Sequence, residues 1–264
     1  MNFCYARGRP ALSVLAAIVR AVPASPVSFR SDVTVELVRS SASDSDVLFA
    51  ARVSTQGEQT LEAAQDESLD TSRSKGLINY LMRDRHGSPF EHNSMTFYVQ
   101  APIFVFREFM RHRIASYNEE SGRYRELNPV FYVPGPDRNL VQVGKPGAYD
   151  FLPGSPEQTT LVDSEVRSAC ESAYASYQRM LDAGVAREVA RVVLPLTIYS
   201  SMYVTMNARA LMNFLSLRTK REGTHFPSFP QREIEMVAEK METVWEGLMP
   251  LTASAFNDNG RVAP

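Results

Sequence analysis

Between residues 107 and 125 the chain places five arginines, three glutamates and His112. A guanidinium group is planar and binds phosphate through paired hydrogen bonds, so several together suit a ligand with more than one anionic group. Groups suited to ribose or a base are interleaved with them: Asn118, Glu119, Ser121 and Tyr124. The segment therefore predicts an anion or nucleotide site. The alternative is a solvated helix end whose cations complement the helix dipole.

A helix over residues 103–113 would position the first of these groups. Glu108 and His112 are four residues apart and would share a face, as would Arg107 and Arg111.

A second polar set follows much later in the chain. Arg187 and Arg191 are four residues apart on one predicted helix. A strand then leads into a helix that carries Asn207, Arg209, Asn213 and Arg218. Asn207 suits the N-cap position. Asn213 interrupts apolar neighbours, so we expect a buried amide that recognises a heteroaromatic edge or, alternatively, bonds to the backbone.

The segment from His86 to His92 holds two histidines and a glutamate, which raises the question of a metal site. Gly87 and Pro89 break the helix that a helical zinc motif needs, so we expect no metal here. A loop that packs its polar groups against a ligand or a subunit is the preferred interpretation.

Hydrophobic periodicity and breaker residues predict the elements that carry these groups. We expect strands over 33–38, 93–101 and 197–206, helices over 45–53, 74–85, 164–183, 185–194, 207–218 and 231–248, and a Pro- and Gly-rich loop over 134–160. The first 31 residues contain four arginines and no acidic residue. We expect residues 1–30 to be a disordered N-terminal extension, with a mis-set start codon or a targeting segment as alternatives. Residues 31–264 should form a single domain.

The composition narrows the function class. Of 264 residues, 44% are hydrophobic and 22% charged, and the net charge is −2, which argues against a generally basic nucleic-acid-binding protein. No run of about 20 apolar residues predicts a membrane span. Two cysteines, Cys4 and Cys170, exclude a disulfide scaffold and a four-cysteine zinc site.

Together these blocks resemble the flavin-dependent thymidylate synthases, the ThyX family. Arg111-His112-Arg113, seven residues and Ser121 match the RHR-x7-S signature. Four further blocks occur in the same order: His86 to His92, Asn118 to Tyr124, Arg187 to Arg191, and Asn207 to Arg218. The resemblance covers about residues 31–250, and five ordered blocks make a chance match improbable.

The resemblance implies an α+β subunit with a central mixed sheet flanked by helices. It implies reductive methylation of dUMP to dTMP, with methylenetetrahydrofolate as carbon donor, FAD as hydride donor and NADPH as its reductant. It further implies a cytoplasmic homotetramer whose active sites are shared between subunits, without nucleic acid or membrane as partner. The arginine-bearing N-terminal tail lies outside the part of the chain that resembles the family. Residues 219–230 look like an insertion relative to shorter members of the family, and this insertion could shape the folate or NADPH entrance.

Residue roles are carried over by position. FAD contacts are expected from Ser88, Arg111, His112, Arg113, Glu119, Asn207, Arg209 and Asn213. Contacts with dUMP are expected from Glu108, Phe109, Met110, Arg111, Glu119, Glu120, Ser121, Gly122, Arg123, Arg191 and Arg218. Arg218 is the expected catalytic residue and would favour ionisation at uracil N3, and His86 would face flavin or folate.

The chemistry of the residues agrees with these roles. Cys170 falls on the apolar face of a predicted helix and Cys4 in the tail, so no activated thiol is apparent to attack uracil. An arginine near N3 and the carbonyl oxygens can instead stabilise enolate-like charge. Ser121 would position a ligand rather than act as a nucleophile. A nucleic-acid-binding module and an inactive relative of the family are the remaining hypotheses.

Overall fold

Strand β3 (Ser94–Pro102) is the centre of the fold, and its sequence alternates as a half-buried strand should. Met95, Phe97, Val99 and Ala101 are buried, whereas the residues between them are only partly covered. The computed structural model describes residues 27–59, 71–146 and 148–264. We expected residues 1–30 to form a disordered extension, and residues 1–26 of it lie outside the described part of the chain. Residues 28–30 of the same segment form strand β1 (Ser28–Arg30).

The central sheet has the order β2-β3-β8-β4, with β2 (Thr34–Ser41), β4 (Ser116–Glu119) and β8 (Tyr199–Met206). All its pairs are antiparallel. The parallel pair is β1 with β5 (Val130–Tyr132), in a small separate sheet. The α+β class is confirmed, but the central sheet is antiparallel and not mixed as expected.

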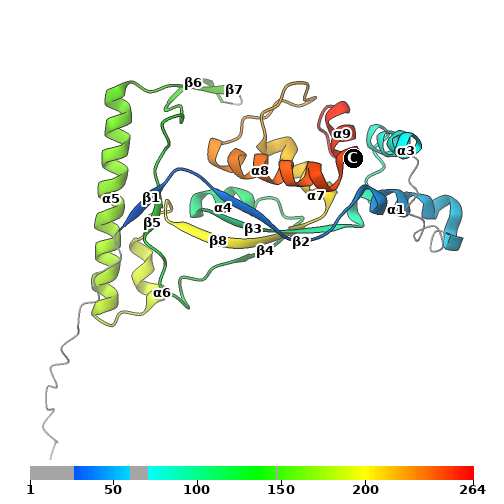
Figure 1. Cartoon of the computed structure of the whole chain (residues 1–264). Helices are drawn as coiled ribbons and strands as arrows, with labels where there is room; N and C mark the ends of the chain where they lie inside the picture. Colours follow the sequence, from blue (N-terminus) through cyan, green and yellow to red (C-terminus); the bar gives the residue numbers. More distant parts are fainter. Residues whose placement is uncertain (1–26, 60–70, 147) are drawn as a thin grey trace, which may run out of the picture.

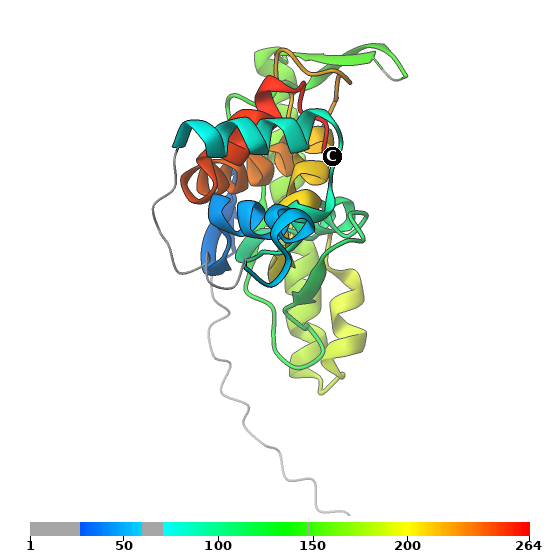
Figure 2. The same cartoon turned by 90° about the vertical axis from the view of Figure 1, so that its right-hand side faces the viewer.

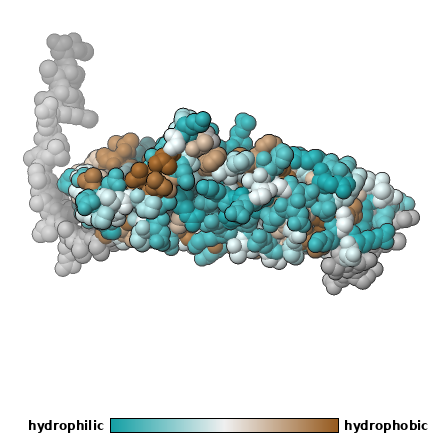
Figure 3. Space-filling view, turned by 90° about the horizontal axis from the view of Figure 1, so that it is seen from above, coloured by the Kyte–Doolittle hydropathy of each residue, from teal (hydrophilic) through white to brown (hydrophobic). Residues whose placement is uncertain are grey.

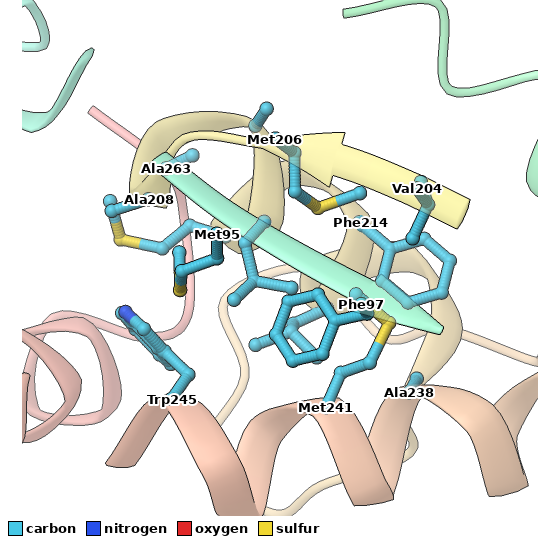
Figure 4. Close-up of a cluster of buried hydrophobic side chains, with 14 of the residues drawn as sticks. Met95, Phe97, Val204, Met206, Ala208, Phe214, Ala238, Met241, Trp245 and Ala263 are labelled. Atoms are coloured by element: carbon cyan, nitrogen blue, oxygen red, sulfur yellow. The ribbon is translucent and has the colours of Figure 1, made fainter. Parts of the chain in front are cut away.

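Helices cover one side of the central sheet (Figure 1). They are α4 (Ile103–Phe109), α7 (Ala208–Arg218), α8 (Arg232–Leu248) and α9 (Pro250–Asp258). Figure 4 shows Phe97 of β3 next to Met241 of α8, and Val204 of β8 next to Phe214 of α7. Burying a side chain of this size stabilises the fold by about 1.5–3 kcal/mol. This core fixes α7, the helix that carries the later polar set.

Two further groups of helices flank the sheet at opposite ends (Figure 1). At one end, α1 (Asp44–Gln56), the short η1 (Gly57–Gln59) and α3 (Thr71–Arg83) lie together, in front in Figure 2. At the other end, the long α5 (Pro156–Asp182) packs against α6 (Arg187–Ala190) and η3 (Arg191–Val193). Serine capping boxes begin both α1 and α5.

Most predicted elements are confirmed, and several segments differ. The helix expected over 185–194 is the short α6 followed by the 3-10 turn η3. The expected loop over 134–160 contains a hairpin of β6 (Val141–Lys145) and β7 (Ala148–Leu152), then the start of α5. Helix α9, absent from the sequence prediction, begins at Pro250 directly after α8. Residues 116–119 form an edge strand, because β8 supplies the hydrogen-bonding partner that their polar sequence does not reveal.

No helix among the described residues is long and apolar enough to cross a bilayer. Seen from above, the surface is mainly hydrophilic, with a hydrophobic patch toward the end that carries α5 (Figure 3).

Candidate active site

Arg218, the last residue of α7, meets the segment that follows α4. Its Nη1 donates to Glu108 Oε2 at 2.8 Å, and its Nε donates to His112 Nε2 at 3.0 Å. Because Nε2 accepts this bond, the proton of the neutral His112 ring is on Nδ1. The Nη2 group of Arg218 forms no hydrogen bond within the described part of the chain. One face of a half-buried guanidinium is therefore left as a donor.

The turn after α4 brings His112 within hydrogen-bonding distance of Arg218. The predicted helix over 103–113 is too long: α4 ends at Phe109, and the N–H groups of Arg111 and His112 bond to carbonyls three residues back. The Tyr117 hydroxyl donates to the carbonyls of Phe109 and His112, at 3.0 and 2.7 Å. These bonds satisfy carbonyls at the helix end and hold His112 toward α7.

Aromatic packing joins the two helices under the site. The Phe109 and Phe214 rings stack at 4.4 Å, and the His112 ring meets Phe214 edge-on at 4.9 Å. Phe109 is fully buried, so its predicted contact with a nucleotide can involve only its main chain.

Arg111 and Arg113 are exposed, and their side chains form no ion pair with other described residues. Met110 beside them is also exposed. Two guanidinium groups that are two positions apart in the chain and form no ion pair suit a multiply charged anion.

The N-terminal end of α7 forms a second part of the site. Asn207 is the N-cap and accepts from the Ala210 N–H, as predicted. Arg209 pairs with Glu91 and donates to the Pro264 carbonyl. A Cβ at Gly87 would lie 2.6 Å from Arg209 Nε, so glycine is required for this approach. Ser88, exposed on η2 (Ser88–Glu91), follows directly.

Asn213 corrects an expectation. We expected a buried amide inside an apolar helix, but the side chain is exposed and its Nδ2 donates to the Arg209 carbonyl at 3.1 Å. It lies on the solvent side of α7, because the apolar positions around it face the core.

A third group lies where β4 ends and α6 begins. Gly122 is buried, and a Cβ there would lie 3.3 Å from Arg191 Cδ. Burial raises the pKa of Glu119, and nearby Arg191 opposes the rise. The ion pairs Arg123–Glu188 at 2.9 Å and Arg125–Glu120 at 3.1 Å frame the segment. The Ser121 hydroxyl accepts from the Arg123 N–H at 3.3 Å.

One chain thus divides the predicted dUMP residues between two places. Glu108, Arg111 and Arg218 gather at α4 and α7, whereas residues 119–123 and Arg191 gather at β4 and α6. Among the described residues, no side-chain hydrogen bond or ion pair joins the two places.

The comparisons with known proteins decide the family. The model of the family described as "Thymidylate synthase complementing protein" matches residues 36–251. The flavin-dependent thymidylate synthase of Streptomyces coelicolor is 69% identical over 239 residues, covering 90% of this chain and 96% of that protein. The chain belongs to the ThyX family.

Other relatives support the same membership. The flavin-dependent thymidylate synthase of Tropheryma whipplei is 60% identical over 236 residues, which cover 89% of this chain and 97% of that protein. The crystal structure of the UMP/dUMP methylase PolB from Streptomyces cacaoi with 5-Br dUMP superposes with a TM-score of 0.84 at 58% identity. It covers 90% of this chain and 100% of that one.

Several residues of this ThyX-family chain support the site in ways that the sequence did not predict. Asn93 Oδ1 accepts from the Ala208 N–H at 2.8 Å, a second cap of α7. Tyr117 and Phe214 hold His112, and Glu91 holds Arg209. Their types are ordinary for a strand or a helix, so only the tertiary contacts reveal their roles.

The segment from His86 to Glu91 packs as a loop. His86 is exposed and stacks on Tyr80 with ring centroids 5.5 Å apart. Within the described residues, no three His, Cys, Asp or Glu side chains are grouped to hold a metal ion.

His112 should make stability depend on pH. Burial, Arg218 and Arg111 lower its pKa from 6.5 to about 4. Between these values the unfolded chain takes up a proton that the folded chain does not, so stability is full above pH 6.5 and falls as the pH drops toward 4. We expect a loss on the order of 2 kcal/mol, because solvent screens part of the effect of a partly exposed ring.

Urea unfolding between pH 7 and 4 would measure this loss in wild type and in His112→Gln. The difference between the two should shrink as the pH falls, whereas a His225→Asn control at an exposed histidine should track wild type. A parallel decline in all three would contradict the assignment.

Proposed function

We propose that this chain is a flavin-dependent thymidylate synthase that methylates dUMP to dTMP. The arrangement of Arg218 carries the proposal: Glu108 and His112 fix a half-buried guanidinium that presents an unused Nη2, and Arg111 lies near enough to lower its pKa. That geometry suits a flat ring with polarised oxygens attached to a phosphate. The names of the relatives support the same reaction.

The residues present fit an FAD. The unpaired Arg111 and Arg113 suit its pyrophosphate. Ser88, His112, Glu119, Asn207, Arg209 and Asn213 complete the set that we propose to hold it. FAD supplies the reducing hydride when bound, and we propose NADPH as its reductant and methylenetetrahydrofolate as the carbon donor.

The division of the dUMP residues supports a site built by more than one chain. We propose that Arg218, Arg111 and Glu108 to Met110 of one subunit meet Glu119 to Arg123 and Arg191 of another. Apolar side chains beside both groups are exposed in the single chain: Ile114 is 73%, Tyr124 80% and Val192 77% exposed. Such exposure marks an interaction surface, and a homotetramer is the assembly we propose. The cytoplasm remains the expected compartment.

Arg218 would act on the pyrimidine without a covalent enzyme bond. Its Nη2 would donate to the uracil oxygen or N3 where negative charge develops, so that C5 becomes nucleophilic. A cysteine nucleophile is not proposed. Cys170 is buried, contacts the Thr197 hydroxyl at 3.3 Å, and burial raises the pKa of its thiol.

The absorbance spectrum of the purified protein tests the proposal. We expect a flavin spectrum that NADPH bleaches faster when dUMP is present, and dTMP as product once methylenetetrahydrofolate is added. UMP should be assayed beside dUMP, because the PolB relative is a UMP/dUMP methylase. A folded protein that binds no added FAD would refute the proposal, and methylation of UMP in preference to dUMP would change the substrate.

A further inference from the structure

Arg261 is a buried cation outside the proposed ligand contacts. It is only 5% exposed, and its φ of 58° lies in the left-handed region, which non-glycine residues seldom adopt. A charge in this position is costly unless it is paired. Its Nη1 lies 2.6 Å from Glu242 Oε1, and Glu242, on α8, is as deeply buried.

The other end of the Arg261 guanidinium reaches the end of α7. Nη2 donates to the Thr219 hydroxyl oxygen at 2.9 Å. Thr219 directly follows Arg218 and is fully buried. Its hydroxyl donates to the Leu215 carbonyl at 2.7 Å, and its N–H bonds to the same oxygen at 3.0 Å. Thr219 is therefore the residue that ends α7, and Arg261 holds it from outside the helix.

Glu242 extends the same network to the segment after α7. Its Oε2 lies 3.0 Å from Arg221 Nη2, and the Ser228 hydroxyl donates to the Thr219 carbonyl. The residues just after Arg218 are thus fixed on one side, while the Arg218 side chain contacts Glu108 and His112 through separate bonds.

We propose that Arg261 and Glu242 are positioning residues that act through Thr219 to hold the Arg218 guanidinium against Glu108 and His112. The inference rests on the proposed function, in which Arg218 faces the pyrimidine. Fixing the last turn of α7 sets where its guanidinium lies, and a displacement of about 1 Å can lower a rate by about 100-fold. A network that contributes stability alone would not have this effect on turnover.

Thr219→Val separates the two roles. It removes the hydroxyl at nearly constant shape. We expect kcat at saturating dUMP to fall by about 10- to 100-fold, with KM for dUMP changed by less than about threefold. Thr219→Ser keeps the hydroxyl that Thr219→Val lacks, so its kcat should stay close to that of wild type. Arg261→Lys keeps the charge beside Glu242 without the fork that also reaches Thr219, and should lower kcat as Thr219→Val does.

Thr252→Val is the matched control. Thr252 is another fully buried threonine, and its hydroxyl donates to buried Asp44 at 2.6 Å, away from Arg218. This variant should lose stability in the same way and keep the wild-type kcat. An equal fall of kcat in the control would overturn the proposal, as would a kcat for Thr219→Val within about twofold of wild type.

Nuclear magnetic resonance gives a readout that does not depend on activity. The Arg218 Nε–Hε signal, identified by its loss in Arg218→Lys, should shift or broaden in Thr219→Val and stay unchanged in Thr252→Val. An unchanged signal in Thr219→Val would overturn the proposal even if kcat fell. A wild-type protein without thymidylate synthase activity would refute the proposed function, and the spectra would still decide whether Thr219 positions Arg218.

Discussion

Replacing Arg218 with alanine should lower kcat for dTMP formation by about 10²- to 10³-fold, the usual cost of removing one donor to charge that develops in the transition state, about 3–4 kcal/mol. The effect should be large because Arg218 is half-buried, where charge is poorly screened, and because Glu108 and His112 fix its guanidinium. Burial lowers the pKa of Arg218, and Glu108 opposes this shift. The residue thus remains a cation that is weakly solvated and oriented by two bonds.

The measurement is single-turnover formation of dTMP with flavin already reduced, which isolates the steps after reduction. Arg218→Lys should be measured beside Arg218→Ala. An ammonium group keeps the positive charge, but it lacks the planar guanidinium that can donate to Glu108, His112 and a ligand at the same time. We expect it to recover little of the rate. Near-wild-type turnover in Arg218→Ala would show that the role assigned to Arg218 is wrong.

Replacing Arg191 with alanine should weaken dUMP binding by about 10- to 100-fold, the range for a lost hydrogen bond to a charged group, about 1.5–3 kcal/mol. Arg191 packs on the backbone of Gly122 and lies near Glu119, so its guanidinium is held beside the segment that we propose binds dUMP. The change in kcat should be smaller than the change in affinity, because the contact exists before the reaction begins.

Titration of dUMP into the flavin-loaded protein at fixed ionic strength measures this effect. Arg179→Ala is the control: it removes an exposed arginine of the neighbouring α5, bonded to the Ser176 hydroxyl, and should leave the affinity unchanged. Unchanged dUMP affinity in Arg191→Ala would count against this placement, and equal losses in both variants would indicate a general electrostatic effect.

Many of the strands and helices that carry the site residues could be predicted from local sequence. The alternation over residues 93–101 predicts β3 because side chains on a strand point to opposite faces. Asn207 predicts the start of α7 because its side chain caps a helix N-terminus. The hairpin of β6 and β7 was missed because its Gly and Pro residues suggest a loop. Helix α9 was missed because it follows α8 without a separating turn.

The amino-acid sequence by itself determined which kinds of group the site contains, since the arginines, His112 and the amides are recognisable by type and order. Only the tertiary structure decided which of them meet. Glu108 and His112 share Arg218 because α4 stops at Phe109 and the next turn tightens, and Asn213 faces solvent because the core takes the other side of α7. The pairing of Thr219 with Arg261, 42 residues away, has no local signal, because hydrogen bonds between distant segments form only once the core has brought those segments together.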